Sequence, residues 1–180
     1  MRRFAVVVPL LLSLSACNTV YQRATSPQTA SIRFLASQYK GYYSTMNVYA
    51  HNDEKCGTPK KIVGIGGGIF NMGGASEKNA DIGMSKDPSG QYAAGQYFET
   101  TVDAGSRFHF TVTGGERNSI CYVSSSFLPE PQAEYEVTYS TDMTYCYVSI
   151  EKISSVGTTF ARAPEPSSEQ RPKACSFFWN

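Results

Sequence analysis

The stretch most suggestive of chemistry is Gly64–Gly74, GIGGGIFNMGG, because glycine-rich loops can bind phosphates through their backbone amides. It does not spell GxGxxG, since Ile69 stands where the third glycine would be after Gly64 and Gly66, and it does not spell GxxxxGK[ST]. No helix is expected after it to offer an amino terminus to a phosphate. The sequence therefore predicts no nucleotide ligand here, and a bent or bulged strand or a mobile loop instead. Its apolar residues are candidate contacts with a partner or with lipid: Ile69, Phe70 and Met72.

The side chains that commonly carry catalysis or hold metals are sparse. The two histidines, His51 and His109, are far apart, no HExxH pattern accompanies them, and no serine lies in a GxSxG pattern. Glu134 and Glu136 share one face of an expected strand, and paired carboxylates can serve a glycosidase, but alternating acids are more typical of a solvent-facing surface. We interpret His109, which lies beside Arg107, as a surface histidine too. We therefore expect no catalytic site, no metal site, no cofactor and a protein that is not an enzyme.

The first seventeen residues resemble a signal for export. Two arginines are followed by the apolar run Phe4–Leu14, which is too short for a helix of about 20 residues that spans a bilayer but fits a secretory signal. Leu14-Ser15-Ala16-Cys17 resembles the lipobox of bacterial lipoproteins. The resemblance implies cleavage after residue 16 and lipidation of Cys17, so that the membrane is a partner through this residue. Asn18 in the next position favours the outer membrane by the same resemblance, and we expect the periplasmic face.

Removal of residues 1–16 leaves a single domain of near-neutral charge. Two of the 16 basic residues would be lost and none of the 15 acidic ones, so neither a nucleic-acid footprint nor a polybasic membrane patch is expected. We expect residues 17–30 to be a lipidated, flexible tether and residues 31–160 to be the folded domain. Residues 161–180 begin as a Pro/Ser-rich strap, which we expect a disulfide of Cys175 to hold, and the three aromatic residues Phe177–Trp179 near their end are expected to pack on the domain.

Alternation of apolar and polar residues indicates β structure throughout the domain. In the segment RFHFTV the phenylalanines Phe108 and Phe110 face one way and Arg107 and His109 the other, and EYEVTY repeats this pattern around Tyr135. Turn residues separate several such short segments. We therefore predict an all-β fold, an antiparallel β-sandwich of Ig-like or jelly-roll-like type, with a small barrel as the alternative.

The domain has four cysteines besides Cys17, and an even number in an exported chain favours two disulfides over free thiols or a metal site. Four cysteines allow three pairings. The strand alternation places Cys121 and Cys146 on inward-facing positions, so we favour a Cys121–Cys146 disulfide, which leaves Cys56 and Cys175 to pair.

One further motif suggests a binding role. Ser89-Gly90-Gln91-Tyr92 resembles the Ser-Gly-x-x-Tyr-like loop of the bacterial lipoproteins that inhibit C-type lysozymes, although that family tends to have Lys or Arg where this chain has Gln91. The resemblance makes Ser89, Gly90 and Tyr92 candidate binding residues and an inhibitor of a periplasmic hydrolase the alternative function. The leading expectation is a lipid-anchored envelope lipoprotein with a non-enzymatic binding or scaffolding role, whose partner is an envelope protein or a cell-wall component.

Overall fold

The chain is all-β in the part that the computed structural model describes, namely residues 20–36, 38–39, 42–43, 45–65, 81–90, 92, 97–116, 119–141, 145–157 and 159–170. Its strands are β1 (Thr29–Ala36), β2 (Gln38–Tyr39), β3 (Tyr42–Tyr43), β4 (Thr45–His51), β5 (Lys60–Ile65), β6 (Tyr97–Asp103), β7 (Phe108–Glu116), β8 (Ser119–Phe127), β9 (Glu134–Thr141), β10 (Cys146–Val156), β11 (Thr159–Pro164) and β12 (Glu169–Gln170). Within these residues there is no helix that is long and apolar enough to cross a membrane.

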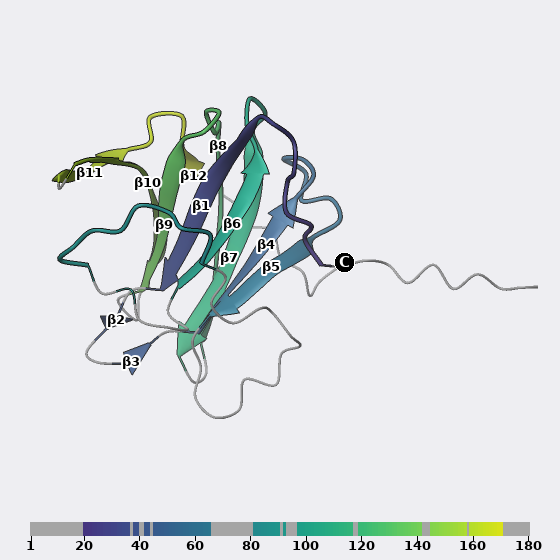
Figure 1. Ribbon diagram of the computed structural model, residues 1–180. Helices are drawn as coiled ribbons and strands as arrows, with labels where there is room; N and C mark the ends of the chain where they lie inside the picture. The colour runs from purple at the N-terminus through teal and green to yellow at the C-terminus, as the bar shows by residue number, and fades with distance from the viewer. Residues whose placement is uncertain are drawn as a thin grey trace, which may run out of the picture.

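Ten of the strands form two five-stranded sheets (Figure 1). The first sheet has the order β11-β10-β9-β1-β6 and the second has the order β12-β8-β7-β4-β5, while β2 and β3 pair separately. The expected all-antiparallel arrangement is wrong for the first sheet, because β1 is antiparallel to β6 but parallel to β9. A parallel pair needs a long crossover, and here strands β2 to β8 lie between its two members in the sequence.

The inner faces of the two sheets share one hydrophobic core. The predicted alternation is confirmed, since Phe110 on β7 and Tyr135 on β9 are both buried in this core. Aromatic rings of one sheet contact rings of the other: Phe34 and Phe110 have ring centroids 5.9 Å apart, and Phe127 and Tyr135 have centroids 4.8 Å apart. Such tilted or edge-on contacts stabilise beyond the area that they bury, so they fix how the two sheets face each other.

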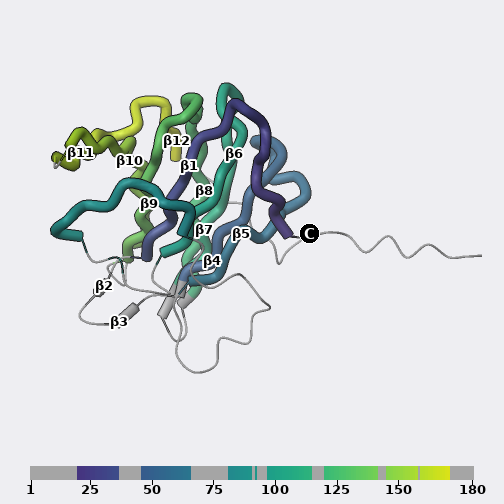
Figure 2. The backbone as a smooth tube through the Cα atoms, viewed as in Figure 1, coloured from purple at the N-terminus to yellow at the C-terminus, as the bar shows by residue number. Residues whose placement is uncertain are grey.

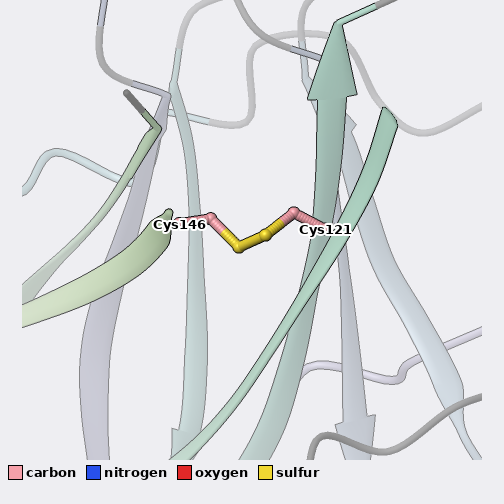
Figure 3. Close-up of a disulfide and its surroundings, with 2 residues drawn as sticks. All are labelled: Cys121 and Cys146. Atoms are coloured by element: carbon pink, nitrogen blue, oxygen red, sulfur yellow. A yellow bond between two sulfur atoms is a disulfide. The ribbon is translucent and has the colours of Figure 1, made fainter. Parts of the chain in front are cut away.

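A disulfide also joins the two sheets. Cys121 on β8 is bonded to Cys146 on β10, as Figure 3 shows. The two Cα atoms are 6.3 Å apart. The predicted Cys121–Cys146 pairing is therefore confirmed. Cys56 is disulfide-bonded as well. Its expected partner Cys175 lies outside the described residues, so that pairing stays a prediction.

The outer face of the second sheet is less exposed than the sequence suggested. Arg107 and His109, expected on a solvent-facing surface, are half-buried, and Thr111 on the same face is fully buried. The hydroxyl of Thr111 is hydrogen-bonded to His51 Nε2 at 2.9 Å and to the hydroxyl of Ser124 at 2.6 Å. Polar side chains can be buried here because neighbouring strands supply their hydrogen-bond partners. We expected this face to be exposed to solvent, and that expectation was wrong. Alternation in the sequence shows which face of a strand is polar, but not whether that face is exposed.

Both ends of the described chain are held against the sheets. Val20, within the expected tether, forms a parallel bridge with Lys61 of β5. Within the expected strap, residues 161–164 belong to β11, which pairs with β10 in the first sheet, and Glu169 and Gln170 form β12, which pairs with β8 in the second. Between these strands the carbonyl of Ser167 accepts a hydrogen bond from Arg107 Nη1 at 3.0 Å. The strap thus crosses from one sheet to the other.

Candidate functional site

Three adjacent strands place charged side chains opposite one another on the outer face of the first sheet. Arg33 of β1 is level with Glu99 of β6 on one side and with Glu136 of β9 on the other. Arg33 and Glu99 are 0% exposed, and Glu136 is 3% exposed. Charged side chains are seldom buried so completely unless they are paired, so this row is the most unusual feature of the described residues.

Arg33 is bound by both acids and by a backbone carbonyl. Its Nε and Nη2 atoms donate to Glu99 Oε1 at 2.9 and 2.7 Å, and its Nη1 atom donates to Glu136 Oε2 at 3.1 Å. Nη2 also donates to the carbonyl of Met84 at 3.2 Å. Burial alone would lower the pKa of Arg33, but the hydrogen bonds and charge of Glu99, and then the hydrogen bond of Glu136, raise it. The guanidinium therefore stays charged.

Two tyrosine rings complete the enclosure of this guanidinium. The Cζ atom of Arg33 lies 4.5 Å from the ring centroid of Tyr92 and 5.8 Å from that of Tyr97. The two rings are 6.0 Å apart and nearly perpendicular. A cation over an aromatic face is attracted by the negative face of the ring, and the attraction grows when water is excluded. The rings thus replace part of the hydration that the buried charge has lost.

A second arginine extends the network from the sheet edge. Arg162 of β11 donates from Nε to Glu136 Oε1 at 3.0 Å, from Nη1 to Asp87 Oδ2 at 2.6 Å and from Nη2 to the Tyr92 hydroxyl at 3.0 Å. The Tyr92 hydroxyl itself donates to Glu136 Oε2 at 3.1 Å. Both carboxylate oxygens of Glu136 are therefore occupied. We call Arg33, Glu99, Glu136, Arg162, Asp87 and Tyr92 the charge network.

Three strand residues of the charge network, Arg33, Glu99 and Glu136, lie under a segment without strand structure, residues 81–90 with Tyr92, which we call the covering segment. Figure 2 shows it crossing the first sheet. Glu99 Oε2 accepts the backbone amides of Ile82 and Met84 at 2.7 and 3.3 Å, and Glu134 Oε2 accepts the amide of Ser85 at 3.0 Å. Side chains of the sheet thus serve as hydrogen-bond partners for the backbone of the segment, in place of a neighbouring strand.

This cover explains why the interpretation of Glu134 and Glu136 as solvent-facing acids was wrong. Glu136 is buried between two arginines, and Glu134 is half-buried beneath Ser85. The opposite charges on β1 and β11 and the amides of the covering segment offset the cost of removing these carboxylates from water.

Before Tyr92, the covering segment forms an exposed turn, Asp87-Pro88-Ser89-Gly90. Asp87 Oδ1 accepts the amide of Ser89 at 2.9 Å and its hydroxyl at 2.7 Å, and the amide of Gly90 donates to the carbonyl of Asp87 at 2.9 Å. The hydrogen bond from the Ser89 hydroxyl and then that from Arg162 lower the pKa of Asp87 to about 2. Pro88, Ser89 and Gly90 are exposed, so the turn is rigid at its base and open at its tip.

Glycine at the last position of the turn allows a close approach to Tyr92. A Cβ atom on Gly90 would lie 2.7 Å from Tyr92 Cε2 and 3.1 Å from the carbonyl oxygen of Asp87. Real Cβ atoms essentially never come as close as 2.7 Å to another atom, so a side chain here would displace the ring of Tyr92 or the turn. Gly90 thus couples the shape of the exposed turn to the position of Tyr92 in the charge network.

The structure brings together only some of the residues predicted to form a binding site. Ser89 and Gly90 lie at the exposed tip, while Tyr92 is half-buried with its hydroxyl engaged inside the protein. Cys17 and the apolar residues of the glycine-rich stretch fall outside the described residues; the latter are Ile69, Phe70 and Met72. Among the described residues, no group of three His, Cys, Asp or Glu side chains could hold a metal ion.

Sequence reasoning missed four members of the charge network: Arg33, Glu99, Asp87 and Arg162. Arg33 and Arg162 are each the single charge of their strands, and Arg33 stands between two core residues, Ile32 and Phe34. A charge between two core residues indicates a buried ion pair, but its partners could not be identified without the strand order.

Comparison with protein-family models, with curated proteins and with solved structures found no match for this chain.

Proposed function

We propose that the chain is a lipid-anchored lipoprotein of the bacterial cell envelope, held through Cys17 at the periplasmic face of the outer membrane. Its folded part is a β-sandwich stapled by a second disulfide, Cys56–Cys175. Its function is non-enzymatic: the exposed turn Asp87–Gly90 binds another envelope protein or a cell-wall component. The lipobox-like sequence ending at Cys17 supports the anchor, and the covering segment supports the binding role.

The observation that carries the binding role is the rigid attachment of an exposed turn by buried, paired charges. Buried ion pairs seldom stabilise a fold more than well-packed apolar residues would, because desolvation offsets their mutual attraction. They do fix geometry, and a binding loop that is already ordered loses less entropy when its partner docks. The charge network can therefore hold the turn between Asp87 and Gly90 in one conformation.

The same pairing argues against using these acids in catalysis. A general base needs an oxygen that can accept a proton from a substrate. Glu136 accepts from Arg33 and Tyr92 on one oxygen and from Arg162 on the other, and Glu99 accepts from Arg33 on one oxygen and from backbone amides on the other. Their partners are the protein's own groups, which favours a structural use of both acids.

The alternative function is inhibition of a hydrolase such as C-type lysozyme by insertion of the turn. The exposure of Ser89 and Gly90 favours it, because an inhibitory loop must present its tip. The position of Tyr92 limits it, since this side chain would have to leave the charge network to enter an enzyme. A turbidity assay of lysozyme with the purified chain separates the two functions. Unimpaired lysis would exclude the inhibitor function, whereas inhibition that is lost in Gly90→Ala would support it.

Crosslinking in intact cells tests the binding role directly. A photo-crosslinking amino acid replaces Ser89 at the turn, and the matched control replaces Ile120, which is 68% exposed and belongs to the other sheet. We expect a discrete crosslinked product from position 89 and none of the same mass from position 120. Identical products from both positions, or none from position 89, would contradict a binding role for the turn.

The anchor is tested by the variant Cys17→Ser. We expect it to lose incorporation of labelled fatty acid and to move from the detergent phase to the aqueous phase on phase partitioning. Retention of the acyl label on the variant would show that Cys17 is not the attachment site.

A further inference from the structure

The first described residues tie the free edges of the two sheets together. The amide of Tyr21 donates to the carbonyl of Lys61 on β5 at 2.9 Å, and the hydroxyl of Tyr21 donates to the carbonyl of Thr101 on β6 at 3.1 Å. β5 is an edge strand of the second sheet and β6 an edge strand of the first. Tyr21 therefore spans the open side of the molecule between the sheets.

The attachment continues along β6. The amide of Ala24 donates to the carbonyl of Thr101 at 3.3 Å, and the hydroxyl of Thr101 donates back to the carbonyl of Ala24 at 2.7 Å. Farther along, the amide of Ala104 donates to the carbonyl of Gln28 at 3.0 Å. Burial, and then the negative charge of Asp103, raise the pKa of Tyr21 to about 12, so its hydroxyl remains protonated and able to donate. Residues 20–28 are thus part of the folded body.

This attachment leaves little chain between the body and a lipid on Cys17. Only Asn18 and Thr19 separate Cys17 from Val20, and three residue steps span at most about 11 Å even when fully extended. The headgroup layer on one side of a bilayer is about 5–8 Å thick. A lipidated Cys17 would therefore hold Val20 within a few ångströms of the headgroups.

The surface around Val20 has the chemistry of a membrane contact. Val20 is 56% exposed, Arg23 is exposed, and Lys60 and Lys61 on β5 are half-buried. The guanidinium of Arg23 lies 6.0 Å from the ring centroid of Phe98, on β6. Basic side chains beside a small apolar contact are attracted to anionic headgroups.

We propose that the edge formed by Val20–Arg23 with Lys60 and Lys61, the membrane edge, lies against the anionic phospholipid headgroups of the bilayer that holds the lipid. This inference rests on the proposed lipidation of Cys17. It makes the protein a body of fixed orientation on the membrane rather than a domain on a flexible tether.

The proposed orientation also tells where the partner approaches. The exposed turn is bound to Arg162 of β11, which is at the edge of the first sheet opposite β6. Four strand spacings separate these edges, or about 19 Å. In Figure 1 the start of the described chain lies beside β5 on the right, and the covering segment extends to the far left. The turn therefore points away from the bilayer, so its partner is reached from the aqueous side.

Paramagnetic relaxation measured by NMR tests the orientation. The full lipidated chain is placed in nanodiscs of equal parts phosphatidylcholine and phosphatidylglycerol, with a gadolinium chelate on a fraction of the headgroups. We expect the strongest broadening at the amides of Val20, Tyr21 and Lys61, and the weakest at Ser89. Broadening that is uniform over the domain, or strongest at the turn, would overturn the proposal.

A charge variant with a matched control tests the headgroup contact. The variant Lys60→Gln with Lys61→Gln should flatten the broadening gradient, whereas Lys152→Gln, which removes one ammonium group on β10, should leave it intact. A gradient unchanged by the double variant would overturn the contact with anionic headgroups. The mass of the purified chain separates the two proposals. If the mass shows no acyl chains on Cys17, the proposed anchor is wrong. If the acyl chains are present but the broadening is uniform, only the proposed membrane edge is wrong.

Discussion

Replacement of Arg33 by methionine should destabilise the fold by about 3–5 kcal/mol, because it removes one partner of a buried ion cluster and leaves its acids uncompensated. Methionine fills a similar volume, so the loss comes from charge and not from a cavity. The two acids, Glu99 and Glu136, lose different numbers of hydrogen bonds in this variant. Glu99 Oε1 loses both of its hydrogen bonds, although Oε2 keeps the amides of Ile82 and Met84. Glu136 loses one hydrogen bond and keeps Arg162.

This difference predicts which second substitution rescues the variant. In the Arg33→Met background, Glu99→Gln should recover about 2 kcal/mol, because it neutralises the carboxylate that lost two charge-assisted hydrogen bonds. Glu136→Gln should recover less, since it would leave Arg162 with a weaker partner. Urea unfolding of the full chain, followed by circular dichroism at pH 7.5, measures the free energy of unfolding for each variant. A loss below about 1 kcal/mol at pH 7.5, or equal recovery by Glu99→Gln and by Glu136→Gln, would refute the idea that these charges depend on one another.

Three further predictions concern the turn and the disulfide. Gly90→Ala should lower the free energy of unfolding by about 1–3 kcal/mol in thermal denaturation, because its Cβ would overlap the ring of Tyr92, and it should reduce crosslinking from the turn. Replacement of both Cys121 and Cys146 by alanine should cost about 3–4 kcal/mol in urea unfolding, since their separation of 25 residues sets the loop that the bond closes. The pKa of Asp87 is lowered from 3.8 to about 2 in the folded chain, so the ionised carboxylate stabilises the docked turn at pH values above 3.8. This contribution is lost as the pH falls through about 2. Amide shifts of the turn should therefore stay constant from pH 7 to pH 4 and change only below that, and Asp87→Asn should abolish the change.

The local pattern of the sequence was enough to predict the strands and the faces that form the core. Phe110 and Tyr135 lie where period-two alternation placed them, and the same rule selected Cys121 and Cys146 as a pair. This success has a physical cause, since the side-chain direction in a strand is set by the position in the strand alone.

Burial of the outer face was beyond the local pattern because it depends on which strands become neighbours. Arg33 and Glu136 are charged residues at outward positions in their own strands, and nothing near either one in sequence provides a partner. Only the order β9-β1-β6 places them side by side, and only the covering segment excludes water from them. Likewise, residues 161–170 have a composition typical of disorder, but the edges of β10 and β8 supply backbone partners for two short strands.

The central position of β1 has a consequence for how the chain folds. β1 is synthesised first among the strands of its sheet, but its partners arrive much later: Glu99 is 66 residues beyond Arg33 and Glu136 is 103 residues beyond it. Contacts this distant make folding slow, because a long stretch of chain must be closed before any pairing stabilises it. Until β6 has been made, both edges of β1 and an unpaired arginine stay open to other molecules, and the edge that pairs with β9 stays open longer. The unfolded chain is therefore most in need of a chaperone at its amino-terminal strand, and that need ends only when β9 has paired with it.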